Sequence, residues 1–302
     1  MIDRRTFLAS SIGLAATAVT FAMGEPIKLP RDKNKKVKIY ATTWGNNLPI
    51  NDFCKKVKEA GYDGLEHLLP ETEKAQMEYI NACKKNGLEY AFLILERGKS
   101  FDNHLYYFQK IASQIARLKP SFINCHSGRD IFSFDQNLQV IDVLNKISNE
   151  SNVPIYHETH RQHMFFAGPV SKQYLDRNKD FKITLDISHW CTVHESYLED
   201  QKEIVETALS RTGHIHARVG HPEGPQVSDH RAPEWKVALE NHLQWWDKAV
   251  AAHHKNSNSP MTITTEFGPV DYMPSMPYSR KPLADQWEVN VHMLQLLRER
   301  YS

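Results

Sequence analysis

Eight short β-like runs alternate with longer amphipathic stretches from residue 37 onward, and this alternation constrains the fold more than any other feature of the chain. Within 104–118, for example, apolar side chains recur every three or four positions, which is typical of a helix with one buried face. No break in composition divides the series. It therefore predicts a single closed (β/α)8 TIM barrel rather than an open doubly wound sheet. The strands are expected at Val37–Thr43, Gly64–Leu69, Tyr90–Leu95, Phe122–His126, Pro154–Thr159, Ile183–Ile187, His214–Val219 and Met261–Phe267.

The N-terminal segment, "MIDRRTFLASSIGLAATAVTFAMG", has the layout of a secretory signal peptide. Arg4 and Arg5 resemble the twin-arginine export signal, although Asp3 stands where Ser or Thr is more usual. We predict a cleavable twin-arginine signal peptide at 1–24, a basic linker at 25–36 and the barrel at 37–302. The protein is then expected to be exported to the periplasm, with no stable membrane span after processing. A retained N-terminal anchor is the alternative.

Charge and cysteine content narrow the choice of partners. The 302-residue chain has 37 basic and 36 acidic residues, so its net charge is close to zero with or without 1–24. A neutral surface fits a phosphate backbone poorly, and no nucleic-acid partner is expected. The four cysteines form no Cys-x-x-Cys motif, which favours buried free thiols and leaves disulfides as the alternative. A homo-oligomer is one state that the sequence allows.

The segment "VPIYHETHRQH", residues 153–163, has histidines on both sides of a glutamate but does not fit a zinc protease. A His-Glu-x-x-His helix starting at His157 would put its second ligand at Arg161, which cannot bind a cation. The segment is better explained as a strand followed by a loop. Its glutamate, Glu158, would then stand at the end of the fifth strand.

Metal-capable side chains stand at or near the ends of the last four expected strands: Glu158, Asp186, His216 and Glu266. Because the carboxyl ends of barrel strands surround one mouth, these four are expected to bind one divalent ion. His214 shares a strand face with His216, but His216 lies nearer the strand end and is the preferred ligand. Three carboxylates and one imidazole favour Mn²⁺, with Mg²⁺, Co²⁺ and Zn²⁺ as alternatives.

Over residues 37–300 the chain resembles the sugar phosphate isomerase/epimerase superfamily, whose members have a xylose-isomerase-like TIM barrel. The resemblance rests on "AGYDGLE", "HETH", "LDISHW", "HIHAR" and "TEFG". It implies that the four residues above bind the ion and that Glu158 and Glu266 also act as the acid/base pair. The resemblance also implies that His189, Glu66 and Arg218 bind substrate. Positions at the rim after the first, fourth and fifth strands add Trp44, His126 and His160 to the expected substrate-binding residues.

The expected activity is that of a metal-dependent isomerase or epimerase of a free sugar or keto-sugar, acting through an enediolate. The alternative is a lyase or dehydratase that acts on 3-keto-glycosides or related keto-sugars and begins with the same proton abstraction. A hydrolase like the apurinic endonucleases is disfavoured, because the third strand, "LEYAFLIL", adds no histidine ligand. A non-catalytic sugar-binding protein would not need both glutamates.

The loop at 220–235 is rich in Gly and Pro and is expected to cover the site. Within it, Asp229, His230 and Arg231 are weaker candidates for contact with the ligand, as is Arg129 after the fourth strand.

Overall fold

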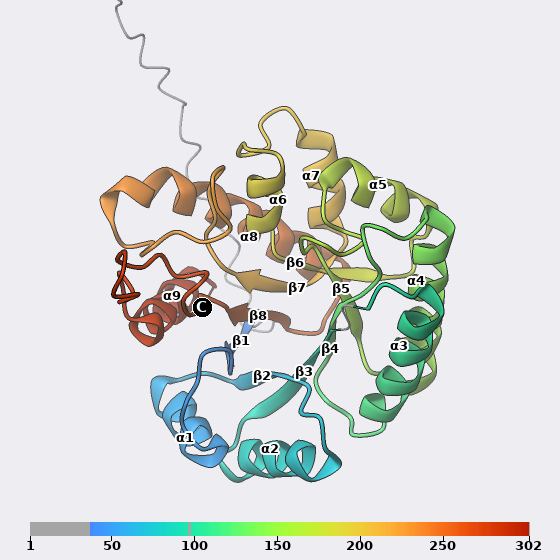
Figure 1. The fold of residues 1–302 in the computed structure, drawn as a ribbon, viewed down its shortest axis with the longest axis horizontal. Coiled ribbons are helices and arrows are strands. Elements are labelled where there is room, and N and C mark those ends of the chain that lie inside the picture. Colours follow the sequence, from blue (N-terminus) through green and yellow to red (C-terminus); the bar gives the residue numbers. More distant parts are fainter. Residues whose placement is uncertain (1–36, 96–97, 302) are drawn as a thin grey trace, which may run out of the picture.

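A computed structural model describes residues 37–95 and 98–301, and in it eight parallel strands close into one barrel. The strands pair in sequence order, and β1 completes the ring by pairing with β8 (Figure 1). The predicted TIM barrel is thereby confirmed. The predicted signal peptide at 1–24 and linker at 25–36 lie outside the described residues. The strands are β1 (Val37–Thr42), β2 (Gly64–Leu68), β3 (Glu89–Leu95), β4 (Ile123–His126), β5 (Ile155–Glu158), β6 (Lys182–Leu185), β7 (Thr212–Ala217) and β8 (Met261–Thr265).

Helices surround the barrel and bury one face each against it (Figure 1). In α4, for instance, Val140, Ile141 and Leu144 are buried, and the helix begins with a capping box formed by Ser133 and Gln136. The described elements outside the barrel are α1 (Ile50–Ala60), α2 (Glu73–Lys85), α3 (Phe101–Ala116), α4 (Phe134–Ser151), α5 (Gly168–Arg177), α6 (Ser188–Val193), α7 (Lys202–Ser210), η2 (Pro233–Trp235), α8 (Lys236–Asn256) and α9 (Gln286–Tyr301).

Several strands end before their predicted limits, and the reason lies in local hydrogen bonds. β6 stops at Leu185 because the carboxylate of Asp186 accepts the backbone N–H of Ser188 at 3.2 Å, which turns the chain into α6. β8 stops at Thr265, and the N–H of Phe267 donates to the Asn290 side chain at 2.9 Å instead of to a strand. Asp186 and Glu266 therefore stand one residue beyond their strands, on the rim of the barrel.

Aromatic rings fill the amino-terminal end of the barrel interior. Tyr40 and Phe122 pack edge to face with ring centroids 5.3 Å apart, and Tyr156 packs against this cluster. Two glycines make room for the rings: a Cβ at Gly64 would lie 2.3 Å from the Tyr40 ring, and one at Gly213 would lie 2.3 Å from the Tyr156 ring. We call Tyr40, Phe122 and Tyr156 the barrel floor. The polar interior of the barrel lies above this floor.

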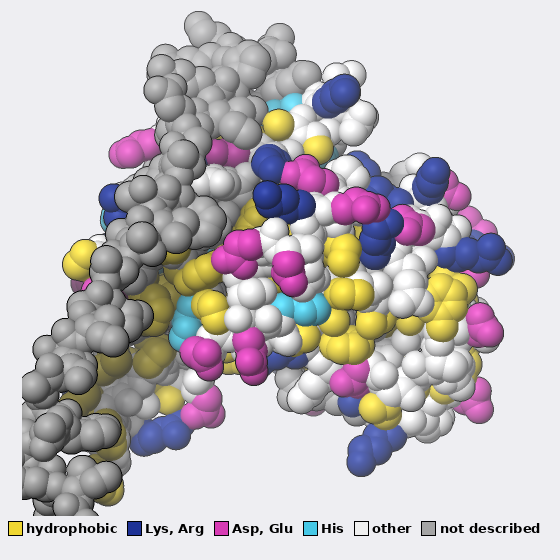
Figure 2. Space-filling model, turned by 90° about the horizontal axis from the view of Figure 1, so that it is seen from above, with side chains coloured by type: hydrophobic (Ala, Val, Ile, Leu, Met, Phe, Trp, Pro, Cys, Tyr) yellow, Lys and Arg dark blue, Asp and Glu magenta, His cyan; other side chains and the backbone are white. Residues whose placement is uncertain are grey.

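The surface carries charges of both signs (Figure 2), and the cysteines are buried. Figure 2 shows basic and acidic side chains interspersed on one face of the molecule, as the near-zero net charge predicts. The four cysteines are buried free thiols, and the sulfur atoms of Cys54 and Cys83 lie 3.8 Å apart. None of the helices within residues 37–95 and 98–301 has the length and apolar character needed to cross a bilayer.

Candidate metal centre

Four residues that are far apart in the sequence meet at the carboxyl end of the barrel. Glu158 ends β5, His216 lies in β7, and Asp186 and Glu266 follow β6 and β8. Each offers a ligand atom, and these four atoms lie within 4.8 Å of one another. His216 Nδ1 is 2.9 Å from Glu266 Oε2 and 3.5 Å from Glu158 Oε2. The barrel therefore brings together the complete set of ligands predicted from the sequence.

Buried atoms without hydrogen-bond partners test whether this set fits a cation. Glu158 Oε1, His216 Nδ1 and Glu266 Oε2 are all buried and lack such a partner. His216 Nδ1 and Glu266 Oε2 lie 2.9 Å apart but are not aligned for a hydrogen bond. Two atoms that bind the same ion are arranged in this way. Leaving such polar groups buried and unpaired is costly. Three carboxylates and one imidazole suit a divalent ion that accepts oxygen ligands, so the residues fit.

Electrostatic interactions within the centre are strong because all four residues are buried. Burial raises the pKa of Asp186 to about 6; Arg218 opposes this shift, whereas Glu266 and Glu158 add to it. For His216, burial lowers the pKa, but the neighbouring carboxylates outweigh burial and hold the pKa well above its usual value. Excess negative charge at this point favours a proton or a metal cation.

Polar side chains next to the candidate ligands contact them through hydrogen bonds. Glu66 Oε2 lies 3.1 Å from His216 Nε2 and accepts the Thr264 hydroxyl at 2.5 Å. Asn124 Nδ2 donates to Glu158 Oε2 at 2.6 Å. Such contacts fix the orientation of metal ligands and tune their basicity. The sequence gives no motif for Thr264 or Asn124; only their inward-facing positions on strands beside the ligands could have indicated them.

Arg218 and His189 reach the centre, as predicted for substrate contacts. Arg218 donates a hydrogen bond to Asp186, lies 3.6 Å from Glu266 Oε2 and lies 2.8 Å from His189 Nε2. Burial lowers the pKa of Arg218, but Asp186 and Glu266 outweigh it and hold the pKa above its usual value. Burial also lowers the pKa of His189 well below its usual value, and His160 and Arg218 add to the effect. The pair therefore offers one charged and one neutral group.

Two aromatic side chains form the outer wall beside Arg218. The rings of Trp44 and Tyr272 meet edge to face at 4.9 Å, and the Arg218 guanidinium lies 4.6 Å from the Tyr272 ring centroid. The Tyr272 hydroxyl also accepts a hydrogen bond from Arg161 at 3.1 Å. Sequence reasoning found Trp44 but missed Tyr272, because Tyr272 lies in an irregular loop that no strand pattern marks.

The other predicted residues occupy different depths. Glu66 lies below the ligands and contacts His216, whereas His126 lies beside Glu158, with His126 Nε2 3.0 Å from Glu158 Oε2. The ring centroid of His160 lies 4.2 Å from that of His126 and 4.0 Å from that of His189.

The weaker candidates have other partners: Asp229 binds Arg231, His230 lies 2.9 Å from His292, and Arg129 donates to backbone carbonyls of Gln162 and Gly98.

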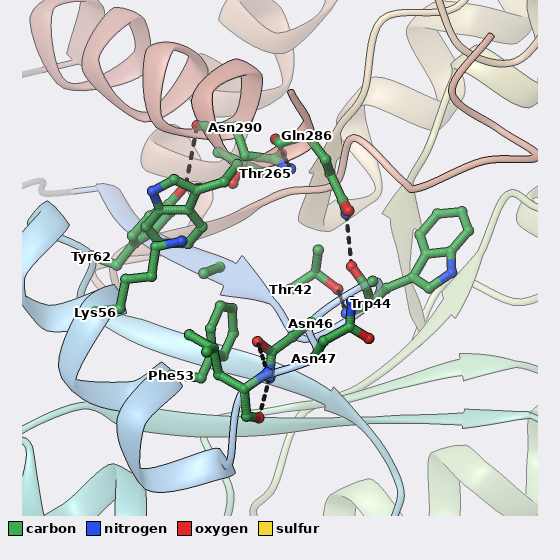
Figure 3. Close-up of a pocket in the computed structure, with 14 residues that line it drawn as sticks. Thr42, Trp44, Asn46, Asn47, Phe53, Lys56, Tyr62, Thr265, Gln286 and Asn290 are labelled. Carbon is green, nitrogen blue, oxygen red and sulfur yellow. Dashed lines mark hydrogen bonds between the residues drawn. The ribbon is translucent and has the colours of Figure 1, made fainter. Parts of the chain in front are cut away.

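A pocket of about 580 Å³, including space open to solvent, lies beside the centre between the β1–α1 loop and α9. Figure 3 shows carboxamide side chains around it, with the ring of Trp44 turned away from the pocket. Gln286 Nε2 donates to the Trp44 carbonyl oxygen at 2.7 Å and holds this loop against α9. None of the four candidate metal ligands lines the pocket. The candidate metal centre at the barrel mouth is therefore separate from this pocket.

The fold and the site together define the class of protein, a TIM barrel of the sugar isomerase/epimerase type. A model of the xylose isomerase-like TIM barrel family matches residues 54–247, and the chain belongs to this family. No curated protein matches the sequence significantly.

Several solved structures share the fold at low sequence identity. A 3-keto-D-glucoside 4-epimerase from E. coli is 16% identical with a TM-score of 0.55, and the match covers 87% of this chain and 100% of that one. A probable 3-DHS dehydratase from Bacillus anthracis is 15% identical with a TM-score of 0.54, over 87% and 99%. A xylose isomerase-like barrel protein from Mycobacterium smegmatis, in complex with magnesium, is 10% identical with a TM-score of 0.56, over 88% and 98%.

Proposed function

We propose that this protein is a divalent-metal-dependent isomerase or epimerase of a free sugar or keto-sugar. The observation that carries the proposal is the meeting of Glu158, Asp186, His216 and Glu266 at one buried point, with unpartnered ligand atoms on three of them. Mn²⁺ is the first ion to test, followed by Mg²⁺, Co²⁺ and Zn²⁺. Membership of the family supports the proposal, and so does the magnesium complex of a structural neighbour.

The chain's own residues would divide the chemistry as follows. Glu158 and Glu266 would take the proton from the carbon next to the substrate carbonyl and return it, one from each face of the enediolate. The bound cation would supply electrostatic stabilisation of negative charge on the substrate oxygens. Arg218 and His189 would donate hydrogen bonds to those oxygens. Trp44 and Tyr272 would pack against the sugar and exclude water.

A lyase or dehydratase of 3-keto-glycosides or related keto-sugars is the second candidate. It needs an acid that protonates the leaving oxygen, and the glutamate that has taken the substrate proton would supply it. One neighbour in the fold comparison is a 3-keto-D-glucoside 4-epimerase and another is a probable 3-DHS dehydratase, so both types of reaction occur on this fold.

Proton NMR in D₂O with 3-keto-glucosides and free ketoses distinguishes these functions. For an epimerase or isomerase, the metal-loaded protein incorporates deuterium next to the carbonyl without net elimination. Release of water or an aglycone identifies the lyase. At low metal concentration Asp186→Asn should strongly reduce either reaction, whereas Glu206→Gln, whose side chain pairs with Lys248 away from the mouth, should not. If wild-type protein with each of the four metals exchanges no proton and releases no group, the proposal is wrong.

We further propose that residues 1–24 direct export by the twin-arginine route, which carries folded proteins. The test is a fusion of this segment to a reporter, with Arg4→Lys and Arg5→Lys combined. Loss of periplasmic reporter in the double variant supports the proposal, and unchanged export contradicts it.

A further inference from the structure

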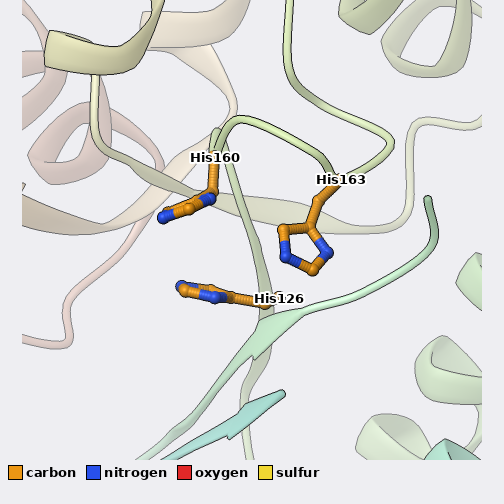
Figure 4. Close-up of side chains that lie close together, drawn as sticks. All are labelled: His126, His160 and His163. Atoms are coloured by element: carbon orange, nitrogen blue, oxygen red, sulfur yellow. The ribbon is translucent and has the colours of Figure 1, made fainter. Parts of the chain in front are cut away.

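Three histidines gather on one side of the candidate metal centre without belonging to its four ligands. His126 ends β4, and His160 and His163 lie in the loop after β5. Figure 4 shows the ring of His160 over that of His126, with His163 beside both. Each ring offers one nitrogen, and these three nitrogens lie within 4.8 Å of one another.

Hydrogen bonds identify which nitrogen of each ring is available. His126 Nε2 lies 3.0 Å from Glu158 Oε2, His160 Nδ1 lies 2.6 Å from the Arg161 carbonyl oxygen, and His163 Nδ1 lies 3.0 Å from the Gly128 carbonyl oxygen. Each of these nitrogens must donate its N–H, because the partners are acceptors. The opposite nitrogen of each neutral ring then carries a lone pair. Metal-binding histidines are held in this way, with one nitrogen on an oxygen acceptor and the other on the ion.

A second observation indicates that the cluster lacks a partner. His126 Nδ1, the nitrogen opposite Glu158, is buried and has no hydrogen-bond partner. Its side chain is only 8% exposed, so bulk water reaches it poorly. A buried acceptor of this kind needs a donor or a cation.

We propose that His126, His160 and His163 form a second cation site. Three imidazole ligands favour a transition metal such as Zn²⁺, Co²⁺, Ni²⁺ or Cu²⁺, whereas the centre with three carboxylates accepts Mn²⁺ or Mg²⁺. In a tetrahedral Zn²⁺ site with bonds of 2.0–2.1 Å, ligand nitrogens are about 3.4 Å apart, so a small shift of the loop that carries His160 and His163 would close the site. The hydrogen bond between His126 and Glu158 joins the two centres.

Metal counting tests this site without a measurement of catalysis. Purified protein is dialysed first against Mn²⁺ and then against a small excess of Zn²⁺, and bound zinc is determined by mass spectrometry. His163→Gln should bind one zinc ion fewer per chain than the wild type. The matched control is His253→Gln, a buried histidine near the opposite end of the barrel that lies 3.0 Å from the Ser259 carbonyl oxygen; its zinc content should equal that of the wild type.

Copper spectroscopy provides the second measurement. In Asp186→Asn, which impairs the four-ligand centre, the EPR spectrum of one bound Cu²⁺ should retain hyperfine coupling to several imidazole nitrogens. His160→Asn should lose part of this coupling, and circular dichroism checks that each variant is folded. Equal zinc content in wild type and His163→Gln, or loss of nitrogen coupling in Asp186→Asn, would overturn the proposal. Absence of sugar turnover would not affect it, since neither readout depends on activity.

Discussion

The carboxylate of Glu66 lies 3.1 Å from Nε2 of His216, on the opposite side of the imidazole from the Nδ1 that faces the metal centre. Burial raises the pKa of Glu66, but the imidazoles of His216 and His214 outweigh burial and hold the pKa well below its usual value. An ionised Glu66 keeps the proton of His216 on Nε2 and leaves the Nδ1 lone pair for a metal. The relationship therefore links a residue below the site to the geometry of a ligand within it.

Replacement of Glu66 tests this relationship. Glu66→Gln should weaken Mn²⁺ binding about 10- to 100-fold, because the supporting carboxylate is lost while the four ligands remain. Isothermal titration calorimetry measures the affinity, and Glu78→Gln on the exposed side of α2 is the control. Unchanged metal affinity together with a raised KM for the sugar would instead support the substrate contact predicted from the sequence.

Once metal is bound, Glu158 and Glu266 should still be needed for proton transfer, whereas Asp186 should be needed only to bind the ion. At saturating Mn²⁺, Glu158→Gln and Glu266→Gln should each reduce deuterium incorporation about 10²- to 10⁴-fold, because each removes one proton-transfer group. In Asp186→Asn, the loss should follow metal occupancy and recover as the concentration of metal is raised. Full exchange in either Gln variant at saturating metal would contradict the proposed roles.

Removal of metal should increase the contribution of the Arg218 charge to the free energy of unfolding. Its guanidinium is the cation bonded to buried Asp186, so in EDTA Arg218→Met should lower the free energy of unfolding by about 3 kcal/mol. Added Mn²⁺ should reduce this difference, since a divalent ion replaces the lost charge. Urea unfolding with and without metal measures both values.

The control for Arg218 is Arg298→Met. Arg298 pairs with Asp63 at 2.6 Å, and both side chains are about one-third exposed, so the effect should be smaller and independent of metal. If Arg218→Met proved equally destabilising with and without Mn²⁺, the charge-balance explanation would be wrong.

Acid should destabilise the fold through His242, a buried histidine on α8. Its Nδ1 donates to the Ala238 carbonyl oxygen at 2.8 Å and its Nε2 accepts the Gly220 N–H at 3.2 Å, so the folded protein has no place for a second ring proton. Burial lowers its pKa to about 4. The unfolded chain binds the proton at its ordinary pKa, about 6.5, so stability is complete above that pH and falls as the pH decreases toward 4.

From about pH 7.5 to about pH 5, this one group should cost about 2 kcal/mol of unfolding free energy. Urea unfolding at the two pH values measures the loss, and His242→Gln should show a correspondingly smaller difference. An identical pH dependence in wild type and variant would rule out His242 as a source of acid sensitivity.

The sequence predicted the barrel and the meeting of the four ligands because both follow from periodicity and from the common direction of parallel strands. It placed Glu66 at the rim, whereas Glu66 is the third residue of β2 and pairs with Ala91 inside the sheet. Depth of this kind depends on register between strands, which no local pattern encodes. Tyr272 was missed for a related reason, since its loop is placed by contacts with Arg161 and Trp44 rather than by its own sequence.

The barrel floor of Tyr40, Phe122 and Tyr156 limits the routes by which ligands can enter and leave the barrel. Aromatic rings fill one end of the barrel, so the cation and the sugar of the proposed reaction would both have to enter and leave through the barrel mouth. A sugar seated over the four ligand atoms would then obstruct the exit of the ion beneath it. Metal loading should therefore precede sugar binding, and the ion should stay in place through successive turnovers.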